Sequence, residues 1–341
     1  MKIAVVRNED TDGVLFRSPK MCPEKYGRRT VQAVVDALSD GGHSVGLFEG
    51  DMTLLGRLAE FFGAHGSAGA TDALVLNMAY GIQGNDRYTH VPAMLESAGV
   101  PYTGSAPLGH AVCLDKVVAK VLMAQAGLPT PSYRVMSSAE DALGDLRFPL
   151  IVKPRNESTS YGLRLVATRE ELDEAVAAIV AIYHQEALVE EYIDGREVCV
   201  ALLGNDPPEV LPAVELDFGE RALKLMTWDD KFHKRADEPT KICPAELPTT
   251  LSTELADIAT EAFRACHVRD YARVDFRIDP TGRPYVLEIN SMASLGAGGS
   301  FVCAATAAGM DFTALVNRIA DVATLRYTSP LGVGLPAPAG G

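Results

Sequence analysis

Short apolar runs and one amphipathic segment alternate in the first part of the chain. The runs KIAVV at 2–6, SVGLF at 44–48 and ALVLNM at 73–78 are typical of buried strands. Between the first two, apolar side chains recur at helical spacing from Val31 to Leu38, and two glycines end the pattern. The order strand, helix, strand predicts an α/β unit built on a parallel sheet.

Further helix and strand patterns with clear end signals fill the middle of the chain. Asp115 is a capping residue for a predicted helix that ends at Gly127. Thr168 and Glu171 form a capping box, which predicts the start of a second helix. Predicted strands in this part are FPLIVKP, ALVEEYI and EVCVALL.

The segment RVDFRIDPTGRPYVLEIN, residues 273–290, predicts a β-hairpin. Its centre, DPTG, has the residue order that type I turns prefer. Period-two alternation sorts the first strand into two faces, with Val274, Phe276 and Ile278 on one and Arg273, Asp275 and Arg277 on the other. On the second strand it groups Tyr285 with Leu287 and Ile289, and Val286 with Glu288 and Asn290.

This hairpin places two carboxylates opposite each other on neighbouring strands. In the register that the turn implies, Asp275 lies opposite Glu288, and like charges that face each other across two strands repel. A cation bound between them, with Asn290 as a third oxygen ligand, removes the repulsion. Mg²⁺ prefers oxygen ligands and commonly binds through one or two carboxylates and substrate phosphates. The alternative is an acidic face that water solvates.

Length, charge and composition restrict the class of protein and its partners. At 341 residues the chain is too long for one ordinary core, so two or three domains are expected. The hydrophobic share of 47% and the charged share of 22% are typical of soluble globular proteins. With no apolar run of spanning length and a strand at the N-terminus, we expect no membrane segment, no signal peptide and a cytoplasmic location. The net charge of −14 disfavours nucleic acid as a partner, although a few local lysines are enough to hold ATP.

The cysteines and the missing motifs exclude other kinds of site. The six cysteines are scattered without a CxxC pair, which predicts reduced thiols rather than disulfides or a zinc site. The sequence contains neither HExxH nor GxSxG. Zinc protease and serine hydrolase readings therefore have no support.

A polar loop after Lys153 is a candidate phosphate site. It carries Ser158, Thr159 and Ser160 before Gly162. Hydroxyl groups and closely spaced backbone N–H groups in such a loop can hold phosphate oxygens. The alternative is a hydrophilic hairpin turn.

The peptide from Val189 to Glu197 is a candidate nucleoside site. Tyr192 and Ile193 can flank an adenine, and Glu190 can accept a hydrogen bond from its amino group. Glu197 can hold ribose hydroxyls. The alternative is an ordinary charged strand end.

Two later loops complete the set of candidates. Residues 227–235 include Lys231 and form a long loop, a common form of mobile lid, so that Lys231 can reach a phosphate on closure. The alternative is a solvated surface loop. Residues 291–300 are rich in Gly and Ser, and their backbone donors suit an oxyanion hole or a carboxylate site. The alternative there is a flexible link into a helix that begins near Phe301.

The order of these features resembles the ATP-grasp superfamily and, within it, the D-alanine–D-alanine ligase family. The likeness extends from about Leu76 to Leu315. It is carried by LNMAYGIQGNDRYTHVPAMLESAGVPYTGS, LDKVVAKVLMAQAGLPTP, PLIVKPRNESTSYG, LVEEYIDGREV and RVDFRIDPTGRPYVLEIN.

The resemblance implies a fold that joins α/β and α+β parts. A Rossmann-like N-terminal (pre-ATP-grasp) substrate domain at 1–112 is followed by a two-lobed ATP-grasp fold. Its central ATP-binding lobe is expected at 113–193, and its C-terminal lobe with the metal site at 194–328. The Gly-, Pro- and Ala-rich tail at 329–341 is predicted to be disordered.

The resemblance also implies roles for individual residues. Residues matching the ATP contacts are Lys116, Lys153, Thr159, Ser160, Glu190, Tyr192, Ile193, Glu197 and the lid residue Lys231. Asp275, Glu288 and Asn290 match the ligands of two Mg²⁺ ions, for which Mn²⁺ is an alternative. Arg273 matches the arginine that stabilises the reacting phosphoryl and tetrahedral oxygens, with Lys231 and the oxyanion donor Ser294 beside it.

The departures from the family pattern concern the substrates. The family's glutamate-bearing N-terminal loop is absent, and Glu24 is the nearest stand-in. HGxxGED appears as YGIQGND from Tyr80, the lid tyrosine is Phe232 as in some ester-forming relatives, and TSPGMT is SMASLG. The substrate-side candidates are therefore Glu24, Tyr80, Gln83, Phe232, Gly299 and Ser300.

The implied activity is an ATP- and Mg²⁺-dependent carboxylate–amine ligase that forms an amide through an acyl phosphate. Its partners are then a small-molecule carboxylate and an amine, and a homodimer is expected because relatives often form one. The departures favour a specialised dipeptide or amino-acid-amide ligase over the cell-wall D-alanine–D-alanine ligase. Ester-forming and cyclising relatives, and a nucleotide-binding regulator without catalysis, are the alternatives.

Overall fold

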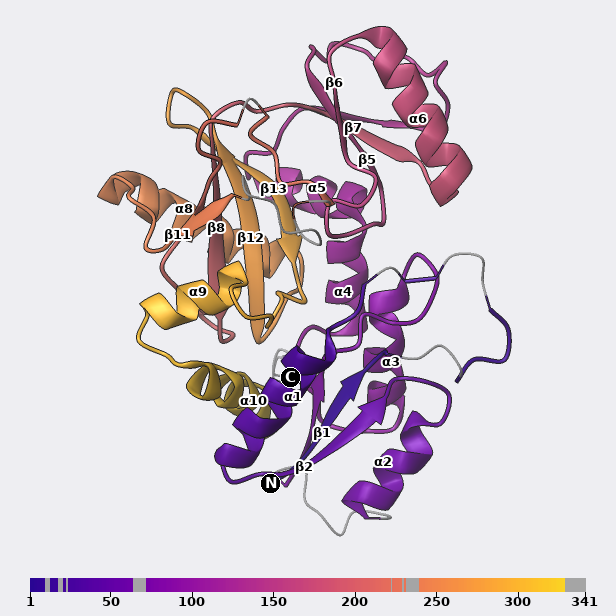
Figure 1. Ribbon diagram of the computed structural model, residues 1–341, viewed down its shortest axis with the longest axis vertical. Helices are drawn as coiled ribbons and strands as arrows, with labels where there is room; N and C mark the ends of the chain where they lie inside the picture. Colours follow the sequence, from indigo (N-terminus) through magenta and orange to yellow (C-terminus); the bar gives the residue numbers. More distant parts are fainter. Residues whose placement is uncertain are drawn as a thin grey trace, which may run out of the picture.

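The computed structural model describes most of the chain. The described residues are 1–9, 13–17, 21–22, 24–63, 72–221, 223–228, 230 and 239–328. The predicted lid residues Lys231 and Phe232 and the predicted tail at 329–341 lie outside them. Figure 1 shows an N-terminal domain at the bottom, a central lobe at the upper right and a C-terminal lobe at the upper left.

A three-stranded parallel sheet forms the N-terminal domain, as the strand and helix patterns predicted. Its strand order is β2-β1-β3. Four consecutive residues of the first strand are buried, which accounts for its continuous apolar run. The elements are β1 (Lys2–Arg7), α1 (Arg28–Asp40), β2 (Ser44–Glu49), α2 (Leu54–Phe62), β3 (Ala73–Asn77), the 3-10 helix η1 (Arg87–Thr89) and α3 (His90–Ser97).

The central lobe is a four-stranded antiparallel sheet covered by one helix. The strand order is β4-β7-β5-β6. Thr168 caps the helix as predicted, because its hydroxyl accepts a hydrogen bond from the Glu171 N–H at 3.2 Å. The elements are β4 (Tyr133–Met136), β5 (Leu150–Pro154), β6 (Arg164–Val166), α6 (Arg169–Tyr183) and β7 (Ala187–Glu191).

A larger antiparallel sheet, with the strand path β11-β10-β8-β12-β13, forms the C-terminal lobe. Helices α5 and α8 pack on it, so Ala119 and Met123 of α5 belong to this core although the predicted boundary assigns them to the central lobe. The elements are β8 (Arg196–Leu203), β9 (Glu209–Val210), β10 (Val214–Asp217), β11 (Thr240–Ile242), α8 (Thr249–Ala265), β12 (Tyr271–Ile278) and β13 (Pro284–Asn290). Helices α4 (Pro107–Leu114) and α5 (Lys116–Gln125) precede it, and α9 (Ser300–Ala307) and α10 (Phe312–Thr328) follow it.

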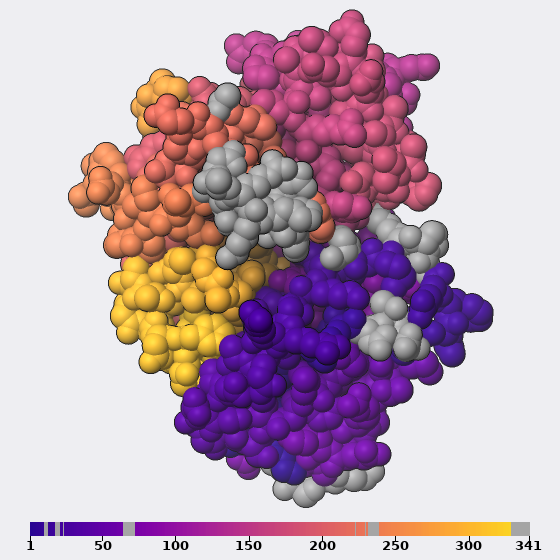
Figure 2. All heavy atoms as spheres, viewed as in Figure 1, coloured from indigo at the N-terminus to yellow at the C-terminus, as the bar shows by residue number. Residues whose placement is uncertain are grey.

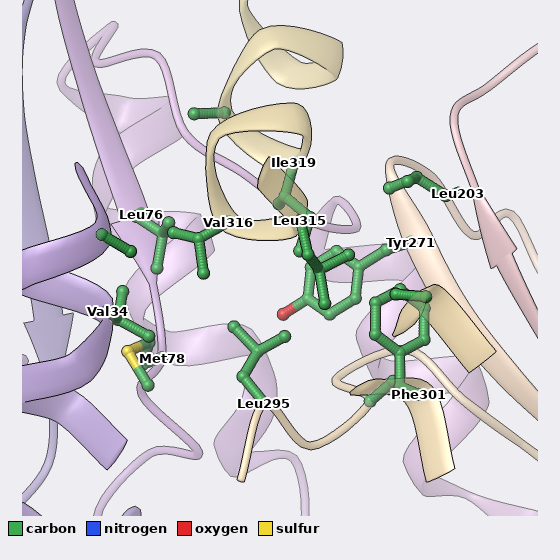
Figure 3. Close-up of a cluster of buried hydrophobic side chains, with 14 of the residues drawn as sticks. Val34, Leu76, Met78, Leu203, Tyr271, Leu295, Phe301, Leu315, Val316 and Ile319 are labelled. Atoms are coloured by element: carbon green, nitrogen blue, oxygen red, sulfur yellow. The ribbon is translucent and has the colours of Figure 1, made fainter. Parts of the chain in front are cut away.

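One hydrophobic core joins the two ends of the chain. Val34 and Leu76 of the N-terminal domain face Val316 and Ile319 of α10, and Phe301 of α9 belongs to the same cluster (Figure 3). The last two helices therefore fix the N-terminal domain against the C-terminal lobe. Figure 2 shows the three parts packed against one another. Among the described helices no single one is long and apolar enough to span a membrane, and the bent pair α9–α10 passes that test only jointly, by length and composition.

Candidate functional site

A cavity of about 830 Å³ lies where the three parts meet. Most of the residues predicted from the sequence line it. They are Glu24, Tyr80, Lys116, Lys153, Thr159, Ser160, Glu197, Arg273, Asp275, Glu288, Asn290, Ser294, Gly299 and Ser300. Gln83, Glu190, Tyr192 and Ile193 are not among the lining residues.

The acidic hairpin has the predicted facing pair, and Asp275 lies opposite Glu288 in the strand register. The predicted alternation of the second strand is wrong beyond that point. A β-bulge follows Asp275, so Phe276 pairs with Val286 and Leu287 is the extra residue. Val286 is fully buried in the core instead of sharing a face with Glu288, and Leu287 lines the cavity.

Cations of the protein itself compensate this carboxylate pair. Arg273 donates to both oxygens of Asp275 at 2.6 and 2.7 Å, and the Asn290 side-chain amide donates to the same carboxylate at 2.9 Å. The ammonium group of Lys116 lies 3.8 Å from Glu288. Burial by itself lowers the pKa of Arg273, but the Asp275 carboxylate outweighs burial and raises that pKa. The hairpin therefore presents charged oxygens that are already held in place.

Two buried lysines and a glutamate form a cluster that reaches the cavity through Lys153. Lys153 and Lys120 reach the two oxygens of Glu190 at 2.6 and 2.9 Å. Burial by itself raises the pKa of Glu190, but the two lysines outweigh burial and lower that pKa. Lys120 was not predicted, although it follows Lys116 by four residues and so lies on the same helix face.

Two of the remaining nucleoside candidates contact Arg277. Glu197 lines the cavity and pairs with Arg277 at 3.2 Å. The ring of Tyr192 lies against the guanidinium of Arg277, at 5.1 Å from the ring centre. Tyr192 is thus placed by a cation–π contact outside the cavity lining.

The candidate phosphate loop has an unusual backbone. Thr159 and Ser160 both have left-handed conformations, with φ of 56° and 59°. A β-branched residue rarely adopts this conformation, and such strain concentrates at functional sites. The next residue, Tyr161, packs against Trp228, at 4.7 Å between ring centres, so this loop touches the segment that leads to residues 231–238.

Tyrosines form the wall that the N-terminal domain contributes. The rings of Tyr26 and Tyr80 are stacked at 5.0 Å, and Tyr88 lies 5.5 Å from Tyr80. The Tyr88 hydroxyl donates to Glu24 at 2.5 Å. Arg87 reaches Glu24 at 3.7 Å and Glu157 of the phosphate loop at 3.2 Å. Sequence analysis gave Tyr88 and Arg87 no role, although both lie in the segment from Leu76 that carries the family resemblance.

The glycine- and serine-rich segment closes the cavity beside the hairpin. Ser294, Gly299 and Ser300 line it, and the Ser294 hydroxyl accepts a hydrogen bond from the Gly296 N–H at 3.2 Å. Gly299 is the N-cap of α9 and provides no side-chain cap. Gln83 lies apart, and its side-chain amide donates to the Phe16 carbonyl at 3.1 Å.

Comparisons with known proteins agree on one family. Residues 122–321 match the family model described as D-ala D-ala ligase C-terminus. An uncharacterized protein, y4sG, of Sinorhizobium fredii is 50% identical over 331 residues, covering 96% of this chain and 98% of that protein. The D-alanine–D-alanine ligase of Bordetella petrii is 32% identical, covering 89% of this chain and 92% of that protein.

Solved structures agree on the fold. The crystal structure of the D-alanine–D-alanine ligase of Bacillus anthracis complexed with ATP matches with a TM-score of 0.74. The match covers 96% of this chain and 98% of that chain, at 21% identity.

Proposed function

Because the chain belongs to the D-alanine–D-alanine ligase family of ATP-dependent carboxylate–amine ligases, we propose that it joins two amino-acid-like substrates through an acyl phosphate. The observation that carries this proposal is the convergence of lysines, carboxylates and Arg273 in one cavity. Phosphorylation gives the carboxylate a leaving group, and the transfer needs positioning and neutralised charge. The N-terminal parallel sheet is then the Rossmann-like substrate domain. The predicted boundaries at 112 and 193 divide the rest into the two ATP-grasp lobes, except that α5 packs with the C-terminal lobe.

We assign the nucleotide to the wall made by the central and C-terminal lobes. Lys116, Lys153, Thr159 and Ser160 hold its phosphates, and Glu197 holds the ribose. Glu190, Tyr192 and Ile193 form the hinge around the base, where Glu190 also orients Lys153. Lys231 contacts the phosphates from the lid.

The acidic hairpin fits a divalent cation. Asp275 and Glu288 place carboxylate oxygens opposite each other on the cavity wall, and Asn290 adds an amide. Mg²⁺ commonly binds through one or two carboxylates together with substrate phosphates. Two Mg²⁺ ions, or Mn²⁺, held here supply charge neutralisation for phosphoryl transfer.

Arg273 and Ser294 serve the reacting centre. The guanidinium of Arg273, fixed by its two hydrogen bonds to Asp275, faces the cavity and stabilises negative charge on the phosphoryl and tetrahedral oxygens. Ser294 lies on the same wall and donates to the tetrahedral oxygen.

The substrate side favours a specialised dipeptide or amino-acid-amide ligase. Glu24 and Tyr80 are proposed to contact the first substrate. Gly299 and Ser300 are proposed to bind the carboxylate of the second substrate. The other two substrate-side candidates are Gln83 and Phe232. The YGIQGND segment from Tyr80 and the SMASLG segment differ from the pattern of enzymes that join two D-alanines. The cell-wall reaction, an ester-forming or cyclising reaction, and nucleotide binding without catalysis are the other readings. We propose small molecules as substrates and a homodimer as the assembly, with no nucleic acid or membrane partner.

An ADP-release screen tests the proposal. Pairs of D- and L-amino acids are supplied with Mg·ATP, ADP is measured, and the product is identified by mass. We expect ADP release that requires both an acid and an amine. Tight ATP binding without turnover across the whole panel would support the regulator instead.

A further inference from the structure

A buried arginine beside the cavity has no role in the reaction described so far. Arg277 follows Asp275 by two residues on β12, so the two side chains lie on the same face of the strand. Only 2% of the surface of Arg277 is exposed, and this residue is not among those that line the cavity. A guanidinium stays charged inside a protein, so its burial requires partners that compensate the charge.

The strand register gives Arg277 a carboxylate partner that belongs to the cavity. Arg277 lies opposite Glu197 across β12 and β8, and its guanidinium is 3.2 Å from the Glu197 carboxylate. Side chains of directly opposite residues share one face of a sheet, so this pair lies on the face that carries Asp275. Glu197 lines the cavity, and the pair therefore reaches the nucleotide site through the carboxylate.

The neighbouring loops hold the guanidinium in one orientation. Arg277 donates to the Gly195 carbonyl at 3.1 Å and to the Lys224 carbonyl. The rings of Tyr192 and Phe218 lie against it, with ring centres at 5.1 and 5.9 Å. The planar fork of an arginine can serve a carboxylate and two carbonyls together, which the ammonium group of a lysine cannot do in the same geometry.

A carboxylate that binds ribose beside a triphosphate needs such a partner. Ribose hydroxyls are neutral donors, whereas the triphosphate is negative and repels an uncompensated carboxylate. A positive charge fixed next to the carboxylate reduces this repulsion. The two oxygens of a carboxylate together accept about four hydrogen bonds, so Glu197 can accept from Arg277 and from ribose at the same time.

We propose that Arg277 is a positioning residue for the nucleotide, which orients Glu197 toward the ribose hydroxyls and compensates its charge. This inference rests on the proposed function, in which Glu197 holds the ribose. Arg277 acts through Glu197 and does not contact the nucleotide. The alternative is a structural role, in which Arg277 only holds the loops of Gly195 and Lys224. The two roles differ in whether the effect of Arg277 depends on the ribose hydroxyls.

Binding of Mg·ATP and of Mg·2′,3′-dideoxy-ATP separates the two roles. Calorimetric titration gives Kd for each nucleotide without any other substrate. The wild type should bind ATP about 10-fold or more tightly than the dideoxy nucleotide, the size of hydrogen bonds to a charged group. Arg277→Met removes the guanidinium and keeps an unbranched side chain, and this ratio should fall below about threefold. A purely structural role would weaken both nucleotides equally and leave the ratio unchanged.

Two further variants test whether Arg277 acts through Glu197. Arg277→Lys keeps a positive charge but not the planar fork, so its ratio should lie between those of the wild type and Arg277→Met. This variant also preserves the test if Arg277→Met folds poorly by its melting temperature. The double variant Glu197→Gln/Arg277→Met should have the same ratio as Glu197→Gln alone, because both changes remove one shared interaction.

Arg283→Met is the matched control. Arg283 belongs to the same hairpin, and its guanidinium also packs on a tyrosine, with the Tyr285 ring centre at 5.1 Å. It is exposed and does not line the cavity, so both Kd values should equal those of the wild type.

The outcomes distinguish this inference from the ligase function. A ratio that Arg277→Met leaves unchanged would overturn the role of Arg277 and leave the ligase function intact. Wild-type binding that ignores the ribose hydroxyls would overturn the role as well, because Glu197 would not hold the ribose. A wild type that binds ATP through these hydroxyls but releases no ADP with any acid and amine would overturn the ligase function alone.

Discussion

The two walls of the cavity differ in their side chains and in the elements that carry them. The wall that we propose holds the nucleotide is charged, and regular strands and one helix hold most of it. Its charged residues are Lys116, Lys153, Arg273, Asp275 and Glu288. The proposed substrate side is the tyrosine wall with the Glu24–Arg87 pair, and it comes from irregular segments around α1 and η1. Phosphoryl transfer needs charges at fixed distances, which strands provide, whereas recognition of a particular substrate is commonly carried by loops.

The largest expected effect is at the hairpin of the nucleotide side. Asp275→Asn and Glu288→Gln each remove a charge that we propose binds the metal, so we expect kcat to fall about 10²- to 10³-fold, which corresponds to several kcal/mol of transition-state stabilisation. Steady-state ADP release measured against Mg²⁺ concentration checks this. Higher Mg²⁺ should restore part of the activity.

Asp206→Asn is the matched control for these two variants. Its side chain is exposed and its ion-pair contact with Arg264 is at 3.5 Å. It should keep full activity at every Mg²⁺ concentration. Wild-type kinetics in either hairpin variant at low Mg²⁺ would remove that residue from the metal site.

Removing the charge of Glu190, which pairs with Lys120 and Lys153, tests whether the proposed nucleotide side is already assembled before ATP binds. Glu190→Gln leaves Lys120 and Lys153 buried without their counter-charge, so the free energy of unfolding should fall by about 3 kcal/mol. Denaturant unfolding of the nucleotide-free protein measures this. Glu191→Gln, on the same strand but paired with the exposed Arg147, should lose less than about 1 kcal/mol. Equal stability of the two variants would contradict the idea of a preassembled wall.

What the sequence predicted well follows the same division. The facing carboxylates and the Thr168 cap depend on local alternation and turn chemistry, which a single segment specifies. Val286 was placed wrongly because a bulge inserts one residue without changing the apolar composition of the strand. Arg87 was missed because its partner Glu157 is 70 residues away, and such a contact exists only after the domains pack.

The buried His110 of α4 predicts a pH dependence of stability. Its Nδ1 lies 2.9 Å from the Ser291 hydroxyl, and burial lowers its pKa to about 3. Below about pH 6.5 the unfolded chain binds a proton that the folded protein excludes, so stability falls as pH falls. Between pH 6.5 and about pH 5 this group should cost about 2 kcal/mol.

Unfolding of His110→Gln at several pH values measures that contribution. The variant should lose stability less steeply than the wild type below pH 6.5. His184→Asn is the control, because His184 is exposed and its left-handed backbone suits asparagine. A slope for His110→Gln identical to that of the wild type would show that His110 is not the group responsible.

The smallest expected effect is that of a substitution at Tyr80, and its effect on KM distinguishes the two walls of the cavity. Tyr80→Phe keeps the ring stacked on Tyr26 but removes the Tyr80 hydroxyl and its hydrogen bond to the Tyr26 hydroxyl. The free energy of unfolding should therefore fall by about 1 kcal/mol. Because Tyr80 belongs to the substrate side, KM for the acid should change a few-fold while KM for ATP stays constant. The Asp275→Asn variant is the counterpart, since its loss should appear in kcat and in the Mg²⁺ dependence. If Tyr80→Phe changed KM for ATP as much as KM for the acid, the two walls would act as one unit and the division drawn from their structures would not hold.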